Sequence, residues 1–291
     1  MDKGLLKKRL AIFLLFSFGL VWGMQAVTYM AGVRYGDSAG SVVLAYAMLC
    51  PVLAMLITRL ITKQGFGGMK MGISLRGKKK YYILAFLVPL FYTEAGCVLY
   101  FLLIKDGADW SFPAFGQLER GLWWLVPAAA LTNALIVSFG GFGEEAGWRG
   151  YMYPMLKELF GAKTGIIIGG VIWGIWHYPM IYQGHNYGTG YFGYPFTGFL
   201  VFTVFTVAMG AWLDELCQKT DSVWAPAFAH AVNNAIMGNT ILSGALNTAE
   251  GSFYDRNRMA AMGILCIPAC VMGLLILFQN GDLKTGQKKT G

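Results

Sequence analysis

Charged side chains are scarce in this chain of 291 residues. Asp, Glu, Lys and Arg together make up 13% of the sequence, whereas hydrophobic residues make up 56%. A soluble domain typically contains about 25% charged residues, so this composition excludes an ordinary water-soluble globular protein and indicates a membrane protein. The stretches between apolar runs are short, and we therefore expect one polytopic domain over residues 1–291.

Three common signatures are also missing. The five cysteines include no CxxC pair, and the one pair spaced i,i+4, Cys266 and Cys270, is typical of helix packing rather than of a metal or disulfide site. There is no HExxH segment, which marks many zinc proteases. We find no internal repeat of the kind that relates the two halves of many transporters.

Eight apolar segments have the length of a membrane span, which is roughly 20 residues. Their approximate bounds are 10–32, 41–62, 81–104, 121–143, 164–184, 195–216, 222–247 and 260–279. The seventh is the least apolar, because His230 and several asparagines interrupt it. The sequence predicts an all-α polytopic membrane protein with about eight transmembrane helices.

The net charge of +8 is explained by the membrane. If the N-terminus is cytoplasmic, the cytoplasmic segments contain 18 of the 23 basic residues and the opposite side contains 5. Because Lys and Arg are enriched in cytoplasmic loops, this distribution predicts that both termini are cytoplasmic. We assign the basic charge to topology and to the lipid bilayer, and we expect no nucleic-acid partner.

Two adjacent glutamates and an arginine, Glu144, Glu145 and Arg149, directly follow the fourth apolar segment. Ionisable groups at membrane depth are costly and are usually functional. On a helix, Glu145 and Arg149 lie about 40° apart, whereas Glu144 and Arg149 lie about 140° apart. This phase predicts an ion pair between Glu145 and Arg149 and leaves Glu144 free to face a cavity. The glycine-rich residues 140–143 predict a break or bend, which places the glutamates at the start of the next helix.

Two histidines lie inside later apolar segments. His177 follows Trp173 by four residues, and His230 precedes Asn234 by four residues, so each pair shares one helix face. A single histidine in a span is often only a packed, hydrogen-bonded group. Two histidines, an asparagine and a spare glutamate together supply a general base, a second proton-handling group and donors for an oxyanion.

A simpler interpretation makes both glutamates solvated residues at the membrane interface, paired with Arg149 and Lys157. Glu94 is a separate carboxylate inside the third apolar segment, and we assign it to a structural hydrogen bond. The predicted bounds also place the candidate residues at different depths. Glu144 falls at the edge of its segment, whereas His230 lies roughly 12 Å and His177 roughly 20 Å into theirs, at about 1.5 Å per residue.

The three motifs together resemble those of a known superfamily. Glu144-Glu145-x-x-x-Arg149, the segment ending at His177 and His230-x-x-x-Asn234 are similar to the motifs of the CAAX-prenyl-endopeptidase and bacteriocin-processing (CPBP, or Abi) family, which includes the type II CAAX endopeptidases. The motif order, the spacing and the placement on consecutive apolar segments agree over about 140–235, within a motif-bearing core of about 121–247. The second motif usually begins with Phe and here begins with Trp173, a change that we expect to affect packing more than chemistry.

The resemblance implies an intramembrane endopeptidase of the glutamate type that needs no cofactor. By resemblance, Glu144 activates a water molecule with help from His177, while His230 and Asn234 stabilise the oxyanion. The predicted ion pair between the second glutamate and the arginine of the first motif holds the site together. The partner is a membrane-associated peptide or protein substrate.

Other readings of the same residues stay open. Glutamate and two histidines can ligate zinc and leave a position for water, which gives a zinc-dependent version of the same hydrolysis. Proton-coupled transporters also place Glu, His and Arg in spans. A non-catalytic immunity protein or scaffold on the same fold is a third alternative.

The substrate and its prenylation cannot be read from the sequence. The family name implies prenylated C-terminal tails, whereas the short loops favour a multi-pass protein of a bacterial plasma membrane. Bacteriocin or pheromone maturation and self-immunity are therefore also plausible roles.

Overall fold

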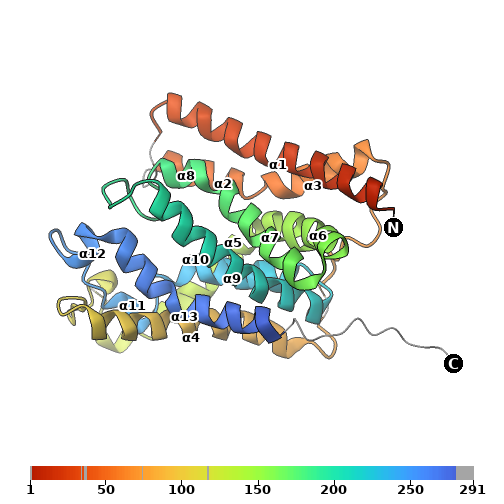
Figure 1. The fold of residues 1–291 in the computed structure, drawn as a ribbon. Coiled ribbons are helices and arrows are strands. Elements are labelled where there is room, and N and C mark those ends of the chain that lie inside the picture. The colour runs from red at the N-terminus through yellow and green to blue at the C-terminus, as the bar shows by residue number, and fades with distance from the viewer. Residues whose placement is uncertain (1, 34, 36–37, 74, 117, 280–291) are drawn as a thin grey trace.

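The computed structural model describes residues 2–33, 35, 38–73, 75–116 and 118–279, which form a bundle of helices (Figure 1). The regular elements of this part of the chain are all helical, as the sequence predicts. They are α1 (Lys3–Met30), α2 (Ser38–Ala47), α3 (Cys50–Ile61), α4 (Lys79–Leu103), η1 (Pro113–Phe115), η2 (Arg120–Leu122), α5 (Leu125–Gly147), η3 (Trp148–Met152), α6 (Tyr153–Phe160), α7 (Ala162–Trp176), α8 (Tyr178–Tyr182), α9 (Phe196–Thr220), α10 (Trp224–Ile236), α11 (Ile241–Gly244), α12 (Phe253–Arg256) and α13 (Arg258–Gln279).

Seven helical segments in the described ranges are long and apolar enough to cross a membrane. They are Lys3–Met30, Ala39–Ile61, Lys79–Leu103, Leu125–Phe160, Ala162–Tyr182, Phe196–Thr220 and Arg258–Gln279. Each overlaps one of the predicted spans, so the prediction of a polytopic membrane protein is confirmed. The exterior fits a lipid environment, because large apolar side chains such as Phe91 and Ile136 are exposed on α4 and α5.

The remaining predicted span, 222–247, forms a shorter element. Its helix α10 has 13 residues, which corresponds to a length of about 20 Å. It is packed against α4, α5 and α9, so it lies inside the bundle rather than facing lipid. The start of α1 and the end of α13 lie at the same end of the bundle (Figure 1). The side of the membrane that holds this end stays a prediction.

Helix α5 continues through the glycine-rich residues 140–143, so the predicted break is wrong. The glycines instead let other backbones come close. A Cβ atom on Gly141 would lie 2.6 Å from the carbonyl oxygen of Ala227 in α10, and one on Gly143 would lie 2.6 Å from that of Met48. Small residues serve close helix approach in this way in many membrane bundles.

This continuity also corrects the predicted depth of Glu144. Helix α5 passes through a turn of π-helix, η3, into α6, and the combined segment Leu125–Phe160 has 36 residues. Glu144 lies near its middle rather than at the edge of a span that ends at residue 143. A π-turn adds a residue to one turn of an α-helix, and such turns are frequent at functional sites.

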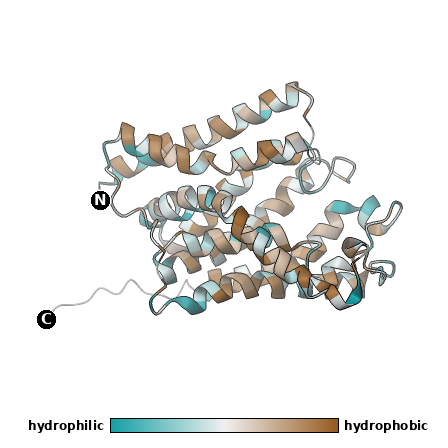
Figure 2. Cartoon of the chain, turned by 180° about the vertical axis from the view of Figure 1, so that it is seen from behind, coloured by the Kyte–Doolittle hydropathy of each residue, from teal (hydrophilic) through white to brown (hydrophobic). Residues whose placement is uncertain are grey.

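Polar and apolar residues are unevenly distributed along the bundle. Hydrophobic residues cover the lengths of the long helices, and hydrophilic residues gather toward the two ends and the connecting loops (Figure 2). The charged side chains near the middle of the combined segment Leu125–Phe160 are buried: Glu144 is 2% exposed, Glu145 0% and Arg149 1%. The interpretation of both glutamates as solvated interfacial residues is therefore wrong.

Candidate active site

Four elements that are separate in the sequence bring the motif residues together. Helix α5 and the following η3 contribute the glutamates and Arg149, α7 contributes Trp173 with His177 at its end, and α10 contributes His230. Hydrogen bonds join these elements across α5, α7 and α10. The difference in depth predicted from the sequence is therefore absent from the fold.

Glu145 is held by two cationic or potentially cationic partners. Arg149 Nη1 donates to Glu145 Oε1 at 2.9 Å, which is the ion pair predicted from helix phase, and both side chains are fully buried. His230 Nδ1 donates to the same oxygen at 2.9 Å. The Arg149 guanidinium also lies over the rings of Trp173 and Tyr153, at 4.3 and 4.8 Å from their centroids. Glu145 thus fixes the positions of both Arg149 and His230.

Lys157, the other predicted partner of the glutamates, pairs elsewhere. Its Nζ donates to both carboxylate oxygens of Asp214 in α9, at 2.7 and 2.9 Å. Gln218 Nε2 donates to Asp214 Oδ2 at 2.7 Å. This second polar cluster connects α6 to α9, and sequence reasoning missed it because its two charges lie far apart in the chain.

Glu144 has a different set of partners. Its Oε2 accepts a hydrogen bond from the indole Nε1 of Trp173 at 2.8 Å and a longer one from that of Trp148 at 3.3 Å. Its other oxygen, Oε1, has no hydrogen-bond partner among the described residues. Trp173 therefore makes a hydrogen bond that the usual phenylalanine could not make, because a phenylalanine ring has no N–H to donate.

His177 is held in one tautomer by its own helix. Its Nδ1 lies 2.9 Å from the carbonyl oxygen of Trp173, and because a carbonyl can only accept, Nδ1 carries the proton and the neutral ring has its lone pair on Nε2. The ring packs against Trp176 and Phe202, each at 4.7 Å between centroids. His177 has no direct hydrogen bond to Glu144 among the described contacts, and Trp173 lies between them in the contact network.

The side chain of Trp173 lies against three of the four residues that are predicted to do the chemistry. It donates to Glu144, and its centroid lies 6.0 Å from the ring of His177 and 5.4 Å from that of His230. Both histidines use Nδ1 in hydrogen bonds. Neither Nε2 atom has a hydrogen-bond partner in the described chain, and the two side chains are buried.

Asn234 stands apart from this cluster. It is exposed and lies one helical turn beyond His230 in α10. Within the part of the chain that the structure describes, its hydrogen bond is with Asn233, whose Nδ2 donates to Asn234 Oδ1 at 3.2 Å. Its amide is therefore accessible at the surface of the bundle, whereas His230 is buried.

Glu94 has the structural role predicted for it. The backbone N–H of Leu242, in the first turn of α11, donates to Glu94 Oε2 at 3.1 Å. This bond satisfies one of the free N–H groups at the start of a helix and ties α11 to α4. Glu94 does not join the cluster around Glu144.

No group of three or more His, Cys, Asp or Glu residues in the described ranges has a metal-binding arrangement. Glu145 Oε1 and both Nδ1 atoms are already used in hydrogen bonds within the protein. These three atoms are therefore not available to ligate zinc.

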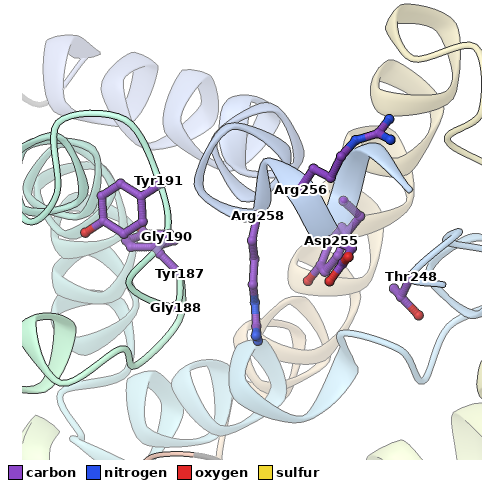
Figure 3. A pocket seen from close by; sticks show the side chains of 9 residues that line it. Tyr187, Gly188, Gly190, Tyr191, Thr248, Asp255, Arg256 and Arg258 are labelled. Atoms are coloured by element: carbon purple, nitrogen blue, oxygen red, sulfur yellow. The ribbon is translucent and has the colours of Figure 1, made fainter. Parts of the chain in front are cut away.

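A separate pocket of about 520 Å³ lies between the loop that contains Tyr187 and the residues around the start of α13. Figure 3 shows Arg258 pointing between Tyr187 on one side and Asp255 on the other, while Arg256 points away. None of the motif residues lines this pocket. It lies at the end of the bundle opposite the N-terminus (Figure 1).

The region that carries the three motifs is similar to known proteins. Residues 120–236 match the family model of the type II CAAX prenyl endopeptidase Rce1-like proteins. A segment of 76 residues is 30% identical to CAAX prenyl protease 2 of Methanococcus maripaludis. That alignment covers 26% of this chain and 28% of the relative, so the similarity spans little more than a quarter of each protein.

Proposed function

Since the chain belongs to the CAAX protease family, we propose that it is an intramembrane endopeptidase of the glutamate type, with Glu144 as the group that activates water. The observation that carries this proposal is the buried cluster in which Trp173 donates to one oxygen of Glu144 and packs against both His177 and His230, while the other oxygen of Glu144 has no hydrogen-bond partner in the described chain. Such a poorly solvated carboxylate and imidazole can share a water molecule and move its proton.

The proposed reaction begins with a water molecule between Glu144 Oε1 and His177 Nε2. Glu144 takes a proton as the water oxygen forms a bond to the scissile carbonyl carbon, and the carbonyl electron pair moves onto its oxygen. When the tetrahedral intermediate collapses, the C–N bond breaks and the protonated Glu144 delivers the proton to the leaving nitrogen. His177 keeps its lone pair toward the water because its Nδ1 proton is held by Trp173.

His230 and Asn234 are the proposed donors to the oxyanion. Because Nδ1 of His230 already donates to Glu145, donation from Nε2 requires the imidazolium form. In that form, two carboxylates, Arg149 and His230 give the buried cluster a net charge of zero, which suits a poorly solvated interior. Glu145 and Arg149 thus support the reaction by holding His230.

The proposed substrate is a membrane-associated peptide or protein tail. The similar protein from Methanococcus maripaludis is named for a CAAX prenyl substrate, and we extend that substrate class to this chain. The multi-pass architecture supports a reaction within a membrane, and we propose that this is the bacterial plasma membrane.

The test uses purified full-length protein and a fluorescence-quenched peptide with a prenylated cysteine near its C-terminus. Glu144→Gln keeps the shape of the side chain and removes the base, and we expect it to lower kcat by at least about 10³-fold. Glu158→Gln is the matched control, because Glu158 lies on α6 outside the cluster, and it should retain wild-type activity. Cleavage at the wild-type rate by Glu144→Gln rules out the glutamate mechanism, and loss of wild-type activity on chelation of metal supports the zinc alternative.

A further inference from the structure

Tyr92 and Asn233 are linked to Asn234 by hydrogen bonds and have no part in the reaction described so far. The hydroxyl of Tyr92 in α4 donates to Asn233 Oδ1 at 2.6 Å. Asn233 Nδ2 in turn donates to Asn234 Oδ1 at 3.2 Å. A chain of two hydrogen bonds therefore connects a buried tyrosine, 5% exposed, to the exposed amide proposed to stabilise the oxyanion.

The direction of this chain is set at the buried end. Asn233 is the only hydrogen-bond partner that Tyr92 has among the described residues. A buried O–H without an acceptor is costly, so Tyr92 donates its proton and the Asn233 carbonyl accepts it. The amino group of Asn233 must then face Asn234 and donate to that residue's carbonyl.

This hydrogen bond decides the orientation of the Asn234 side-chain amide, whose oxygen and nitrogen are nearly isosteric. One end, Oδ1, would repel an oxyanion, and the other, Nδ2, would stabilise it. No other described residue bonds the Asn234 amide, so only the bond from Asn233 distinguishes the two orientations. With Oδ1 engaged, the amino group of Asn234 is left free to donate to another acceptor.

We propose that Tyr92 and Asn233 are positioning residues that orient the Asn234 amide with its amino group toward the reacting carbonyl oxygen. This inference rests on the proposed function. It assigns a role in the reaction to α4, an element that carries none of the three motifs.

A double-mutant cycle on purified full-length protein tests the inference, with the prenylated quenched peptide as substrate. Tyr92→Phe should lower kcat by about three- to tenfold, as the loss of one orienting hydrogen bond implies, and should leave KM unchanged. In an Asn234→Ala background the same change should have no further effect, because the amide that it orients is gone. Asn233→Ala breaks the chain at its middle and should behave like Tyr92→Phe, which keeps the test valid if Tyr92→Phe folds poorly.

Tyr100→Phe is the matched control. Tyr100 is buried on the same helix, and its hydroxyl has no hydrogen-bond partner in the described chain, so we expect unchanged kcat. The inference is overturned if the effects of Tyr92→Phe and Asn234→Ala simply multiply, if KM rather than kcat changes, or if Tyr92→Phe matches Tyr100→Phe. If the effects of Tyr92→Phe and Asn234→Ala multiply while Glu144→Gln is inactive, only the positioning role of Tyr92 and Asn233 is refuted. An active Glu144→Gln variant would refute the proposed function itself.

Discussion

At the scale of single residues, Trp173 is the centre of the candidate site. Its indole N–H donates to Glu144, its backbone carbonyl holds the proton of His177, and its ring packs against Arg149 and His230. A donor at 2.8 Å to a buried carboxylate is a charge-assisted hydrogen bond, which is stronger than a neutral one. The tryptophan therefore fixes which oxygen of Glu144 remains available for water.

Replacing Trp173 by Phe tests this role. The ring is retained, so we expect the protein to fold, but Glu144 loses its shorter hydrogen bond and its orientation, and kcat should fall by about tenfold. Trp212→Phe is the control, because the buried Trp212 indole on α9 has no hydrogen-bond partner in the described chain. Equal kcat values for the two variants would show that the indole N–H does not matter.

Glu145 is predicted to act on stability as well as on the reaction. Glu145→Gln leaves the buried Arg149 without its counter-charge, and breaking a buried ion pair in this way costs about 3–5 kcal/mol. Unfolding of the detergent-solubilised protein, followed by heat or denaturant, measures the change. A second variant, Glu145→Gln combined with Arg149→Met, should recover part of the loss. Stability equal to that of Glu158→Gln would contradict the structural role.

At the scale of the elements, the continuity of α5 through η3 into α6 positions the glutamates. The sequence predicted the ion pair of Glu145 with Arg149 because both residues lie on one helix and their spacing is local. It did not predict the bonds from Trp173 or His230 to the glutamates, because those bonds join helices whose relative placement no local pattern encodes. The break predicted at the glycine-rich residues 140–143 was wrong for a related reason. Glycine lowers helix propensity locally, but Gly141 also lets α10 pack closely against α5, and this contact cannot be read from the local sequence.

Gly141→Ala tests the close approach of α5 and α10. The new Cβ would lie 2.6 Å from the carbonyl oxygen of Ala227, so the helices must separate, and overpacking of this kind costs about 1–3 kcal/mol. The bond between His230 and Glu145 should lengthen, and activity should fall by more than about tenfold. At Gly23 in α1 an added Cβ meets nothing within 4 Å, so Gly23→Ala should leave activity and stability intact. Wild-type activity in Gly141→Ala would show that this contact does not position the site.

At the scale of the whole molecule, composition was enough to predict the architecture. Long apolar segments are a property of the chain itself, and seven of the eight predicted ones are helices of spanning length. The exception, α10, is the helix that carries His230 and Asn234, and it is short and enclosed by α4, α5 and α9. Most side chains of α10 are apolar, so its segment resembles a span in the sequence, but the helix has only 13 residues.

On the proposed function, this cluster cleaves a peptide bond, and Glu144 activates the water. The most direct measurement compares the peptides in membranes and medium of cells that produce the wild-type protein, Glu144→Gln or Glu158→Gln at equal levels. We predict at least one cleaved species with wild type and Glu158→Gln that is absent with Glu144→Gln, where its uncleaved precursor accumulates. The same cleaved species at the wild-type level in cells with Glu144→Gln would contradict the claim.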